Sequence, residues 1–432
     1  MERTWTTELG PLCGRRVLLK GWLHRLRRLS SVSFLLLRDG RGVAQVVVHD
    51  PALARWVAGL AHESVLEVEG TAVAEPQAPG GVEVRDPRVR VVAAAAAAPP
   101  VELFRPLPRA QLPTLLDHAA VTLRHPRRRA CFRLAAAAVR GFRDVLRSRG
   151  FIEIQTPKIV AAAPEGGANV FAVDYFGRRA HLAQSPQLYK QAMVGVFERV
   201  FEVGPAFRAE PHDTPRHLNE YVSLDAEMGF VRDHGTVMDL LRDVLAGMAE
   251  AAGEERDSLE LLGVAAPEVP GRVPSLHFTE ARSMVATALS EDLDRELDLA
   301  PAHESWLGDW ALREHGSELL FVTGYPMARR PFYTHPDPRA TEWSNSFDLL
   351  FRGRELVTGG QRLHRYEDYV AALAARGLDP EPFHGYLEAF RYGMPPHGGF
   401  GMGLARWVAG LVGAANIREV VLFPRDVARL TP

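Results

Sequence analysis

Five short strand-like runs between residues 17 and 92 constrain the fold of the N-terminal part more than any other feature. They are rich in β-branched and large apolar residues and are separated by Gly, Pro and Asp, as short strands usually are. The runs are VLLKGWLH, FLLLRD, VAQVVV, SVLEVEGTAV and VEVRDPRVRVV, and a helix-compatible segment, PALARWVAGLAH, lies between the third and the fourth. Five strands with a helix in that position predict an OB-fold β-barrel.

The first of these runs carries a dense cluster of positive charge. Residues 15–28 contain no acidic side chain and include the basic residues Arg15, Arg16, Lys20, Arg25, Arg27 and Arg28. Two aromatic residues, Trp22 and Phe34, are close to this cluster in the sequence. OB-folds commonly bind single-stranded nucleic acid through basic grooves and aromatic platforms. Taken alone, the stretch is equally compatible with aromatic residues in the barrel core and solvated arginines.

The length of 432 residues predicts two domains, because one ordinary core does not grow to that size. A Pro- and Ala-rich segment, AAAAAAPPVELFRPLP at 93–108, has the composition of a linker. Beyond residue 128, helix-like segments alternate with apolar strand-like runs, which predicts an α+β domain with helices flanking a large sheet. We therefore expect a barrel over 1–100, a linker or hinge over 101–127 and a larger domain over 128–432.

The composition excludes several classes of protein. A formal net charge of −2, with 24% charged and 47% hydrophobic residues, is typical of a globular protein and not of a disordered, fibrous or uniformly basic one. The two cysteines, Cys13 and Cys131, are far apart and belong to no metal-ligand spacing. The N-terminus lacks the apolar core of a signal peptide, and the longest apolar run, at 91–98, is too short to span a bilayer. We expect a cytoplasmic protein.

Three segments of the larger domain together predict a site for ATP and a carboxylate. GFIEIQTPKIV is a strand-like run closed by Pro157, and RVFEVGPAFRAEPHDTPRHLNEYVSLDAEMGF joins two strand-like runs through a loop crowded with Arg, His and Glu. HGGFGMGLARWVAGLV is a glycine-rich turn that enters a helix with Arg406 near its start. Guanidinium groups suit phosphate and carboxylate, and glycines let a backbone approach phosphates. Each segment alone is common as scaffold or salt bridge, so the prediction depends on the set.

The three segments resemble motifs 1, 2 and 3 of the class II aminoacyl-tRNA synthetases, in order and at suitable separations. Four further stretches, PEGGANVF, AQSPQLYKQ, SFDLLFRGRELVTGGQR and FRYGMPPHGGFGMGLAR, resemble the aspartyl and asparaginyl subgroup. In that subgroup an anticodon-binding OB-fold precedes a catalytic domain with an antiparallel sheet flanked by helices. The resemblance covers nearly the whole chain and favours RNA binding by the barrel. It implies a homodimer that activates an amino acid with ATP and transfers it to the 3′ end of a tRNA.

Within the amino-acid site, the resemblance places Glu165 and Gln187 on the main-chain charges of the amino acid. It places Lys190 and Arg362 on the side-chain carboxylate, and gives Arg208 and Thr358 further contacts. A buried lysine needs a negative partner and would face an amide dipole in a site built for asparagine. The asparaginyl enzymes generally lack a lysine at this place in the QLYK segment. Lys190 therefore favours aspartate, and a surface role for this lysine is the alternative.

For ATP, the resemblance assigns catalysis to Arg208, at the α-phosphate, and to Arg406, at the γ-phosphate. Tyr221 occupies the place of an aromatic residue over adenine. The complete set of expected ATP contacts is Arg208, Glu210, Arg216, His217, Leu218, Tyr221, Glu355, Gly403 and Arg406. Asp348 and Glu355 resemble the Mg²⁺ carboxylates, and Thr358 stands where archaeal-type relatives commonly have Ser. Hard oxygen ligands are what Mg²⁺ prefers, although without the family two such acids would be interpreted as surface charges.

The barrel residues Arg27, Phe34 and Gln45 resemble the anticodon readers of the family, in which stacking accepts any base and hydrogen bonds select among bases. The chain lacks the large insertion of typical bacterial aspartyl enzymes and resembles the shorter archaeal type. Some members of that type charge only tRNA-Asp, and others also charge tRNA-Asn. His24 and Pro79 replace a bulky aromatic residue and a lysine that strictly selective relatives tend to carry, which favours the relaxed group.

The resulting expectation is an aspartate-tRNA ligase that uses ATP and Mg²⁺, acts on tRNA-Asp and also on tRNA-Asn, and has no membrane partner. Neutral variation at His24 and Pro79, and hence a strictly tRNA-Asp-specific enzyme, is one alternative. The others are an asparaginyl-tRNA synthetase, opposed by Lys190, and a non-catalytic RNA-binding paralogue. Loss of any of Arg208, Glu355 and Arg406 would have favoured the paralogue, and the chain contains all three.

Overall fold

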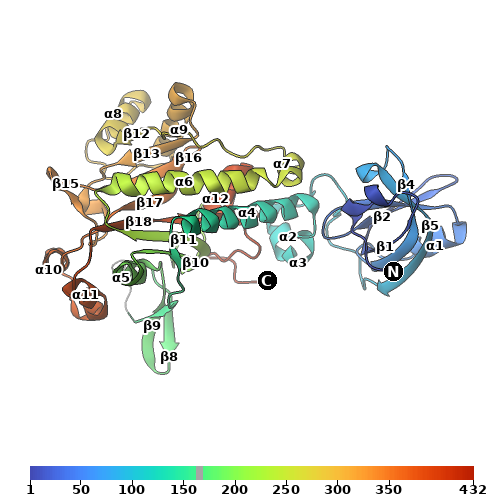
Figure 1. Ribbon diagram of the computed structural model, residues 1–432, viewed down its shortest axis with the longest axis horizontal. Helices are drawn as coiled ribbons and strands as arrows, with labels where there is room; N and C mark the ends of the chain where they lie inside the picture. Colours follow the sequence, from blue (N-terminus) through green and yellow to red (C-terminus); the bar gives the residue numbers. More distant parts are fainter. Residues whose placement is uncertain (162–168) are drawn as a thin grey trace. The chain divides into compact units, whose positions relative to one another are not determined.

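The computed structural model describes residues 1–161 and 169–432, which form two compact units, Met1–His125 and Pro126–Pro432 (Figure 1). The boundary between the units lies inside the segment 101–127 expected as a linker. The three-part division of the chain expected from the sequence stays a prediction. None of the described helices is both long enough and apolar enough to cross a membrane.

The N-terminal unit is a closed five-stranded barrel with the strand order β1-β2-β3-β5-β4. Its elements are β1 (Arg16–Arg28), β2 (Ser33–Arg38), β3 (Val43–Val48), α1 (Pro51–Ala58), β4 (Val65–Ala74) and β5 (Val82–Ala93). Alternate residues point into the barrel, as with Leu35 and Leu37, which are fully buried. The Asp50 side chain caps α1 by accepting a hydrogen bond from the Ala52 amide. The strands and the position of the helix are as predicted, which confirms the OB-fold.

The segment that follows the barrel contains two short helices, α2 (Leu112–Asp117) and α3 (Ala119–Thr122). A buried carboxylate, Glu63, ties the end of this segment to the barrel. Its Oε2 atom accepts hydrogen bonds from Arg38 Nη2 at 2.6 Å and from Arg124 Nη1 at 3.1 Å. The segment 101–127 expected as a linker therefore contains two helices of its own and is attached to the barrel of the N-terminal unit.

The C-terminal unit is built on an eight-stranded sheet in the order β12-β13-β16-β17-β18-β11-β10-β6. The strands are β6 (Ile152–Glu153), β10 (Arg199–Phe207), β11 (Glu220–Gly229), β12 (Ser275–His277), β13 (Leu319–Thr323), β16 (Ser346–Phe351), β17 (Arg354–Gln361) and β18 (His397–Gly403). Neighbouring strands are antiparallel except for the two edge pairs, β12 with β13 and β6 with β10. The expected antiparallel sheet is confirmed.

Helices flank this sheet. Two of them, α4 (Pro126–Ser148) and α6 (His234–Gly253), run side by side (Figure 1). They approach closely at Gly141, where a Cβ atom would lie 2.4 Å from the Gly247 carbonyl oxygen. The other helices are α5 (Gln187–Phe197), α7 (Arg256–Leu262), α8 (Phe278–Leu289), α9 (Pro301–His315), α10 (Tyr366–Ala375), α11 (His384–Arg391) and α12 (Leu404–Val412). Phe142 on α4 and Phe400 on β18 meet edge to face in the core, so this helix packs directly on the sheet.

Two smaller sheets complete the unit. One consists of β7 (Ile159–Val160), β9 (Arg178–Leu182) and β8 (Ala172–Tyr175), and the other of β14 (Pro336–Asp337) and β15 (Ala340–Ser344). The strand-like run GFIEIQTPKIV contributes only the short strands β6 and β7.

The glycine-rich segment was predicted to be a turn, and this prediction is wrong. It forms strand β18, which lies inside the sheet between β11 and β17. A Cβ atom at Gly399 would lie 2.1 Å from the Ala226 carbonyl oxygen, and one at Gly398 would lie 2.7 Å from the Gly360 carbonyl oxygen. The glycines thus allow close packing of three adjacent strands. Only the last of them, Gly403, lies directly before the first residue of the helix α12.

Candidate active site

A cavity of about 570 Å³ opens in the C-terminal unit. Nearly all the residues that the sequence predicted for amino acid and ATP line it. They are Gln187, Lys190, Arg208, Glu210, Arg216, His217, Leu218, Tyr221, Glu355, Thr358, Arg362, Gly403 and Arg406. Asp348 is not among the lining residues, and Glu165 lies outside the described residues. The structure therefore brings together residues that are more than 200 positions apart in the chain.

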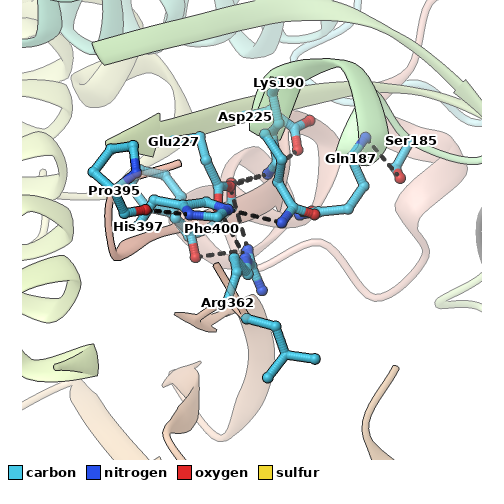
Figure 2. Close-up of polar contacts among 12 residues, drawn as sticks. Ser185, Gln187, Lys190, Asp225, Glu227, Arg362, Pro395, His397 and Phe400 are labelled. Carbon is cyan, nitrogen blue, oxygen red and sulfur yellow. Dashed lines mark hydrogen bonds and ion pairs between the residues drawn. The ribbon is translucent and has the colours of Figure 1, made fainter. Parts of the chain in front are cut away.

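One end of the cavity is a buried cluster of opposite charges (Figure 2). Lys190 projects from α5, and its side chain is only 2% exposed. Its Nζ atom lies 3.0 Å from Asp225 Oδ1 and 3.3 Å from Glu227 Oε2, and it donates a hydrogen bond to the Phe400 carbonyl oxygen at 3.0 Å. Lys190 is therefore not a surface residue, and it is paired with carboxylates of the protein itself.

Arg362 belongs to the same cluster. Its Nε atom donates to Glu227 Oε1 at 2.9 Å (Figure 2). Its Nη2 atom donates to the Gly399 carbonyl oxygen at 2.9 Å. Burial would raise the pKa of Glu227, but the Arg362 guanidinium and the Lys190 ammonium together hold it below its usual range. With Asp225 included, two cations face two anions, so the cluster is formally neutral before any ligand binds.

Asp225 and Glu227 were not predicted as site residues, although the sequence contains a signal for them. Both lie on β11, and together with Ser223 they occupy alternate positions, with the apolar residues Leu224 and Ala226 between them. Residues two apart in a strand point to the same face, so a row of polar side chains on a central strand indicates a polar site. Ser223 adds a short hydrogen bond of 2.5 Å from its Oγ atom to Asp225 Oδ2.

Positively charged side chains occupy another part of the cavity. Arg208 directly follows β10, and Arg406 lies in the first turn of α12. Arg208 Nη1 lies 3.7 Å from Glu210 Oε1, and Arg406 Nη1 lies 3.1 Å from Glu355 Oε1. Both arginine side chains line the cavity and keep more than a third of their surface exposed. Guanidinium groups bind phosphate and carboxylate oxygens well.

The carboxylates expected to bind Mg²⁺ lie on two adjacent strands. Asp348 on β16 is opposite Thr358 on β17, and the Thr358 hydroxyl donates to Glu355 Oε1 at 3.2 Å. Burial raises the pKa of Asp348 despite the attraction of Arg330, and the Glu355 carboxylate adds to the rise. The Oδ1 atom of Asp348 is buried and has no hydrogen-bond partner in the part of the chain that the structure describes. These features fit a bound cation, which would offset the repulsion between the Asp348 and Glu355 carboxylates and would give the Asp348 Oδ1 atom a partner.

The ligands for such a cation are incomplete without a substrate. Within residues 1–161 and 169–432, no group of three or more His, Cys, Asp and Glu side chains is placed to hold a metal ion. Phosphate oxygens are the usual additional ligands of Mg²⁺ in nucleotide sites. Arg330, whose Nη2 atom donates to Asp348 Oδ2 at 3.0 Å, was not singled out by any motif.

Glu304 on α9 is a second charged residue that no motif singled out. Its Oε2 atom accepts hydrogen bonds from the Glu355 amide and from Arg216 Nη1, both at 3.2 Å. Burial, reinforced by the Glu355 carboxylate, raises the pKa of Glu304 to about 7. Glu304 thus connects the loop between β10 and β11 to the start of β17.

Comparison with known proteins identifies the family. The model for class II tRNA synthetases (D, K and N) matches residues 111–427, and the model for the OB-fold nucleic acid binding domain matches residues 17–92. The chain belongs to the class II tRNA synthetases. Membership of this family implies that the synthetase uses ATP and binds tRNA.

Curated relatives resemble the synthetase over its whole length. It is 48% identical to the aspartate–tRNA(Asp/Asn) ligase of Thermus thermophilus, with all of both chains covered. It is 42% identical to the protein of the same name from Archaeoglobus fulgidus, again with all of both chains covered. Among solved structures, the asparaginyl-tRNA synthetase from Pyrococcus horikoshii, complexed with asparaginyl-adenylate, matches with a TM-score of 0.93 at 30% identity, covering all of both chains.

The barrel of the synthetase presents the three expected anticodon readers on one outer face. Arg27 on β1 pairs with Phe34 on β2, and Gln45 on β3 lies two positions from Val47, the partner of Phe34. Arg27 is exposed and Phe34 is half-buried, whereas Gln45 is buried and donates from Nε2 to Glu83 Oε2 at 3.0 Å. Phe34 does not belong to the buried cluster of the barrel core, and neither does Trp22.

His24 and Pro79 occupy different environments. The pairing of β1 with β2 shifts between Leu23 and Arg25, so His24 is the extra residue of a β-bulge, and its side chain is buried. Burial, aided by the charge of Arg38, lowers the pKa of His24 to about 4. Pro79 is exposed in the turn between β4 and β5. His24 is therefore not presented as an exposed side chain on the face that carries Arg27 and Phe34.

The buried His24 predicts that the barrel loses stability in mild acid. Its pKa in the folded chain, about 4, lies below the ordinary histidine pKa of 6.5. The unfolded chain therefore binds a proton first, and stability falls as the pH decreases from about 6.5 towards about 4. We expect the free energy of opening of β1, measured by amide hydrogen exchange on the full chain, to fall by on the order of 1–2 kcal/mol between about pH 7 and about pH 5.

The matched control is His24→Gln, which has no titratable side chain at this position. The variant should lose the part of the pH dependence of β1 opening that comes from His24. The pH dependence that comes from other groups of the barrel should remain. Equal pH dependence of β1 opening in both chains would show that His24 does not titrate as its burial implies.

Proposed function

We propose that the synthetase is an aspartate–tRNA ligase. It activates L-aspartate with ATP to aspartyl-adenylate and transfers the aspartyl group to tRNA-Asp and tRNA-Asn. The observation that carries this proposal is the buried pair of Lys190 and Arg362, which lines the end of the cavity and can bind a side-chain carboxylate. The amide of asparagine would place N–H donors against these two cations, which have only donors to offer. The names of the full-length relatives from Thermus thermophilus and Archaeoglobus fulgidus also support it.

The first step needs no nucleophile from the protein. The α-carboxylate of aspartate attacks the α-phosphorus of ATP, and Arg208 offsets the negative charge that develops on the phosphoryl oxygens. Arg406 binds the departing pyrophosphate, with Arg216 and His217 beside it. Gln187 and Glu165 bind the main-chain charges of the amino acid, Tyr221 covers adenine, and Glu210, Leu218 and Gly403 complete the nucleotide site.

We assign a Mg²⁺ site to Asp348, Glu355 and Thr358. The unsatisfied Oδ1 atom of Asp348 and the proximity of the Glu355 carboxylate support this assignment. When bound there with ATP, Mg²⁺ supplies positive charge to the phosphates. Glu355 would contact the ion while its carboxylate also receives Arg406, so one side chain links the metal and the phosphate-binding arginine.

In the second step, the 3′-hydroxyl of the terminal adenosine of the tRNA attacks the carbonyl of the aspartyl-adenylate, the bond from that carbonyl to the phosphate oxygen breaks, and AMP leaves. The barrel, expected over 1–100, binds the anticodon, with Phe34 stacking and Arg27 and Gln45 hydrogen bonding to unstacked bases. His24 and Pro79, with the names of the relatives, support the relaxed tRNA specificity. The synthetase acts as a homodimer, as the class II resemblance implies, and we place it in the cytoplasm, as expected from its sequence.

Aminoacylation of purified tRNA transcripts tests the proposed function. We expect labelled aspartate on both tRNA-Asp and tRNA-Asn, because His24 and Pro79 resemble the relaxed group and the full-length relatives are named as tRNA(Asp/Asn) ligases. Charging of tRNA-Asp alone would leave the ligase and remove the relaxed specificity. Labelled asparagine, tested in parallel, should not be attached, because Lys190 and Arg362 favour a carboxylate. Charging with asparagine would support the asparaginyl alternative, which the resemblance to the Pyrococcus horikoshii structure favours.

A further inference from the structure

Behind the amino-acid end of the cavity lies a buried hydrogen-bond hub, the side chain of Gln191. It is fully buried and follows Gln187 by four residues on α5, so the two side chains lie on the same side of the helix. Gln191 Oε1 accepts from Gln187 Nε2 at 2.9 Å and from the Tyr386 hydroxyl at 3.1 Å. Gln191 Nε2 lies 2.9 Å from both the Tyr369 hydroxyl and His397 Nε2. All four hydrogen-bonding positions of the amide are thus occupied.

The direction of these hydrogen bonds is fixed first at His397 on β18. Its Nδ1 atom lies 2.9 Å from the Pro395 carbonyl oxygen (Figure 2), and a carbonyl oxygen only accepts. The proton therefore sits on Nδ1. Burial lowers the pKa of His397 to about 4, so the ring is neutral near pH 7 and its Nε2 atom is an acceptor. Gln191 must then donate to His397 through its amide nitrogen.

A second backbone carbonyl fixes the same orientation. The Tyr369 hydroxyl donates its only proton to the Leu363 carbonyl oxygen at 2.8 Å, so towards Gln191 it can only accept. Turning the Gln191 amide by 180° would place its oxygen against acceptors of both His397 and Tyr369. Each of these two buried contacts would then join two acceptor atoms with no proton between them, which would destabilise the folded state. The two carbonyls therefore leave one orientation for the hub, with its oxygen facing Gln187.

The orientation of Gln191 determines what Gln187 presents to a ligand. Because Gln191 Oε1 only accepts, Gln187 must turn its amide nitrogen towards the hub. Gln187 lines the cavity, and its Oε1 atom has no hydrogen bond within the described part of the chain. We infer that Gln191 is a positioning residue that holds the Gln187 carbonyl oxygen towards the cavity, where it accepts a hydrogen bond from the α-ammonium group of the amino acid. This inference depends on the proposed function, since it takes aspartate as the ligand.

Aspartate and succinate together test the inference. Succinate keeps both carboxylates of aspartate but lacks the α-ammonium group. We expect Gln191→Met, which cannot hydrogen bond to Gln187, to raise the KM for aspartate in ATP–pyrophosphate exchange about tenfold. The inhibition constant of succinate, the KM for ATP and kcat should change little. The ratio of succinate to aspartate constants should therefore fall about tenfold.

The matched control is Tyr386→Phe. It removes a different hydrogen bond from the same Gln191 oxygen and leaves the bond to Gln187, so the ratio should stay as in the unaltered chain. A double-mutant cycle adds a second check, because Gln187→Met should lower the ratio on its own and Gln191→Met should lower it no further. Equal weakening of aspartate and succinate by Gln191→Met would overturn the inference, since it would indicate general damage to the pocket.

Two further results separate the possible failures. If the unaltered chain shows no aspartate-dependent exchange, the proposed function itself fails. If Gln191→Met does not fold, the inference can still be tested by a measurement on the unaltered chain. Nitrogen-15 NMR of the His397 ring should show the proton on Nδ1, and a proton on Nε2 would reverse the hub and overturn the inference.

Discussion

Replacing Arg208 by Gln should lower kcat for aspartyl-adenylate formation by about a thousandfold, while the fold stays intact. The reason is the position of the side chain. Arg208 directly follows β10, lines the cavity and keeps 38% of its side-chain surface exposed, which places a positive charge at the wall of the proposed phosphate site. A fixed positive charge at the site of the developing negative charge stabilises the transition state more than the bound ATP.

The measurement is single-turnover formation of aspartyl-adenylate at saturating ATP and aspartate. Arg140→Gln is a suitable control, because Arg140 is similarly exposed on α4 and pairs with Glu254 outside the cavity. It should retain the rate of the unaltered chain. A decrease of less than about tenfold with Arg208→Gln would show that this side chain does not contact the transferring phosphate.

The barrel could be predicted from the sequence because its information is local. Strands such as Ser33–Arg38 alternate between buried and partly exposed positions, and the interruptions between them contain Gly, Pro and Asp. The glycine-rich segment was misinterpreted for the opposite reason. Its glycines are needed because the backbones of the neighbouring strands β11 and β17 approach closely. These strands are distant in sequence, so no local pattern distinguishes glycines needed for close packing from glycines needed for a turn.

The site was only partly predictable. The family resemblance assigned Gln187, Lys190 and Arg362 to one site, and all three line the same cavity in the structure. The resemblance named contacts to a ligand and not the residues that support those contacts. A buried lysine was expected to find its negative partner in the substrate. The structure instead provides carboxylates of the protein, Asp225 and Glu227, whose positions depend on strand register. Aspartate must therefore be recognised by a cluster that is already neutral, so the geometry of the donors matters as much as their charge.

That balance predicts a large effect of Lys190→Met. Removing the ammonium group leaves Glu227 paired with Arg362 alone and leaves Asp225 with no basic partner, within the contacts that the structure describes. Breaking a buried pair from one side typically costs about 3–5 kcal/mol, and we expect a loss of that size in the free energy of unfolding of the C-terminal unit. Aspartate activation should also be lost, because the side-chain carboxylate would meet a net negative cluster.

The pH dependence distinguishes this explanation from a simple packing defect. In the unaltered chain the pKa of Glu227 is held below its usual range, so its contribution to stability is present above about pH 4.5 and is lost as the pH falls through the lower folded value. In Lys190→Met, protonation of a buried carboxylate would relieve the uncompensated charge. The difference in stability between the two chains should therefore narrow as the pH is lowered from about 7 to about 5, as measured by urea unfolding.

Arg140→Met provides the comparison for this experiment too, because it removes a cation from an exposed ion pair of the same unit. Exposed pairs contribute about 0–1 kcal/mol, so this chain should unfold close to the unaltered one at every pH. If the free energy of unfolding of Lys190→Met is lower by the same amount at every pH, the effect results from lost packing of the lysine side chain. A deficit below about 1 kcal/mol at neutral pH would mean that water or a rearranged Arg362 compensates the two carboxylates.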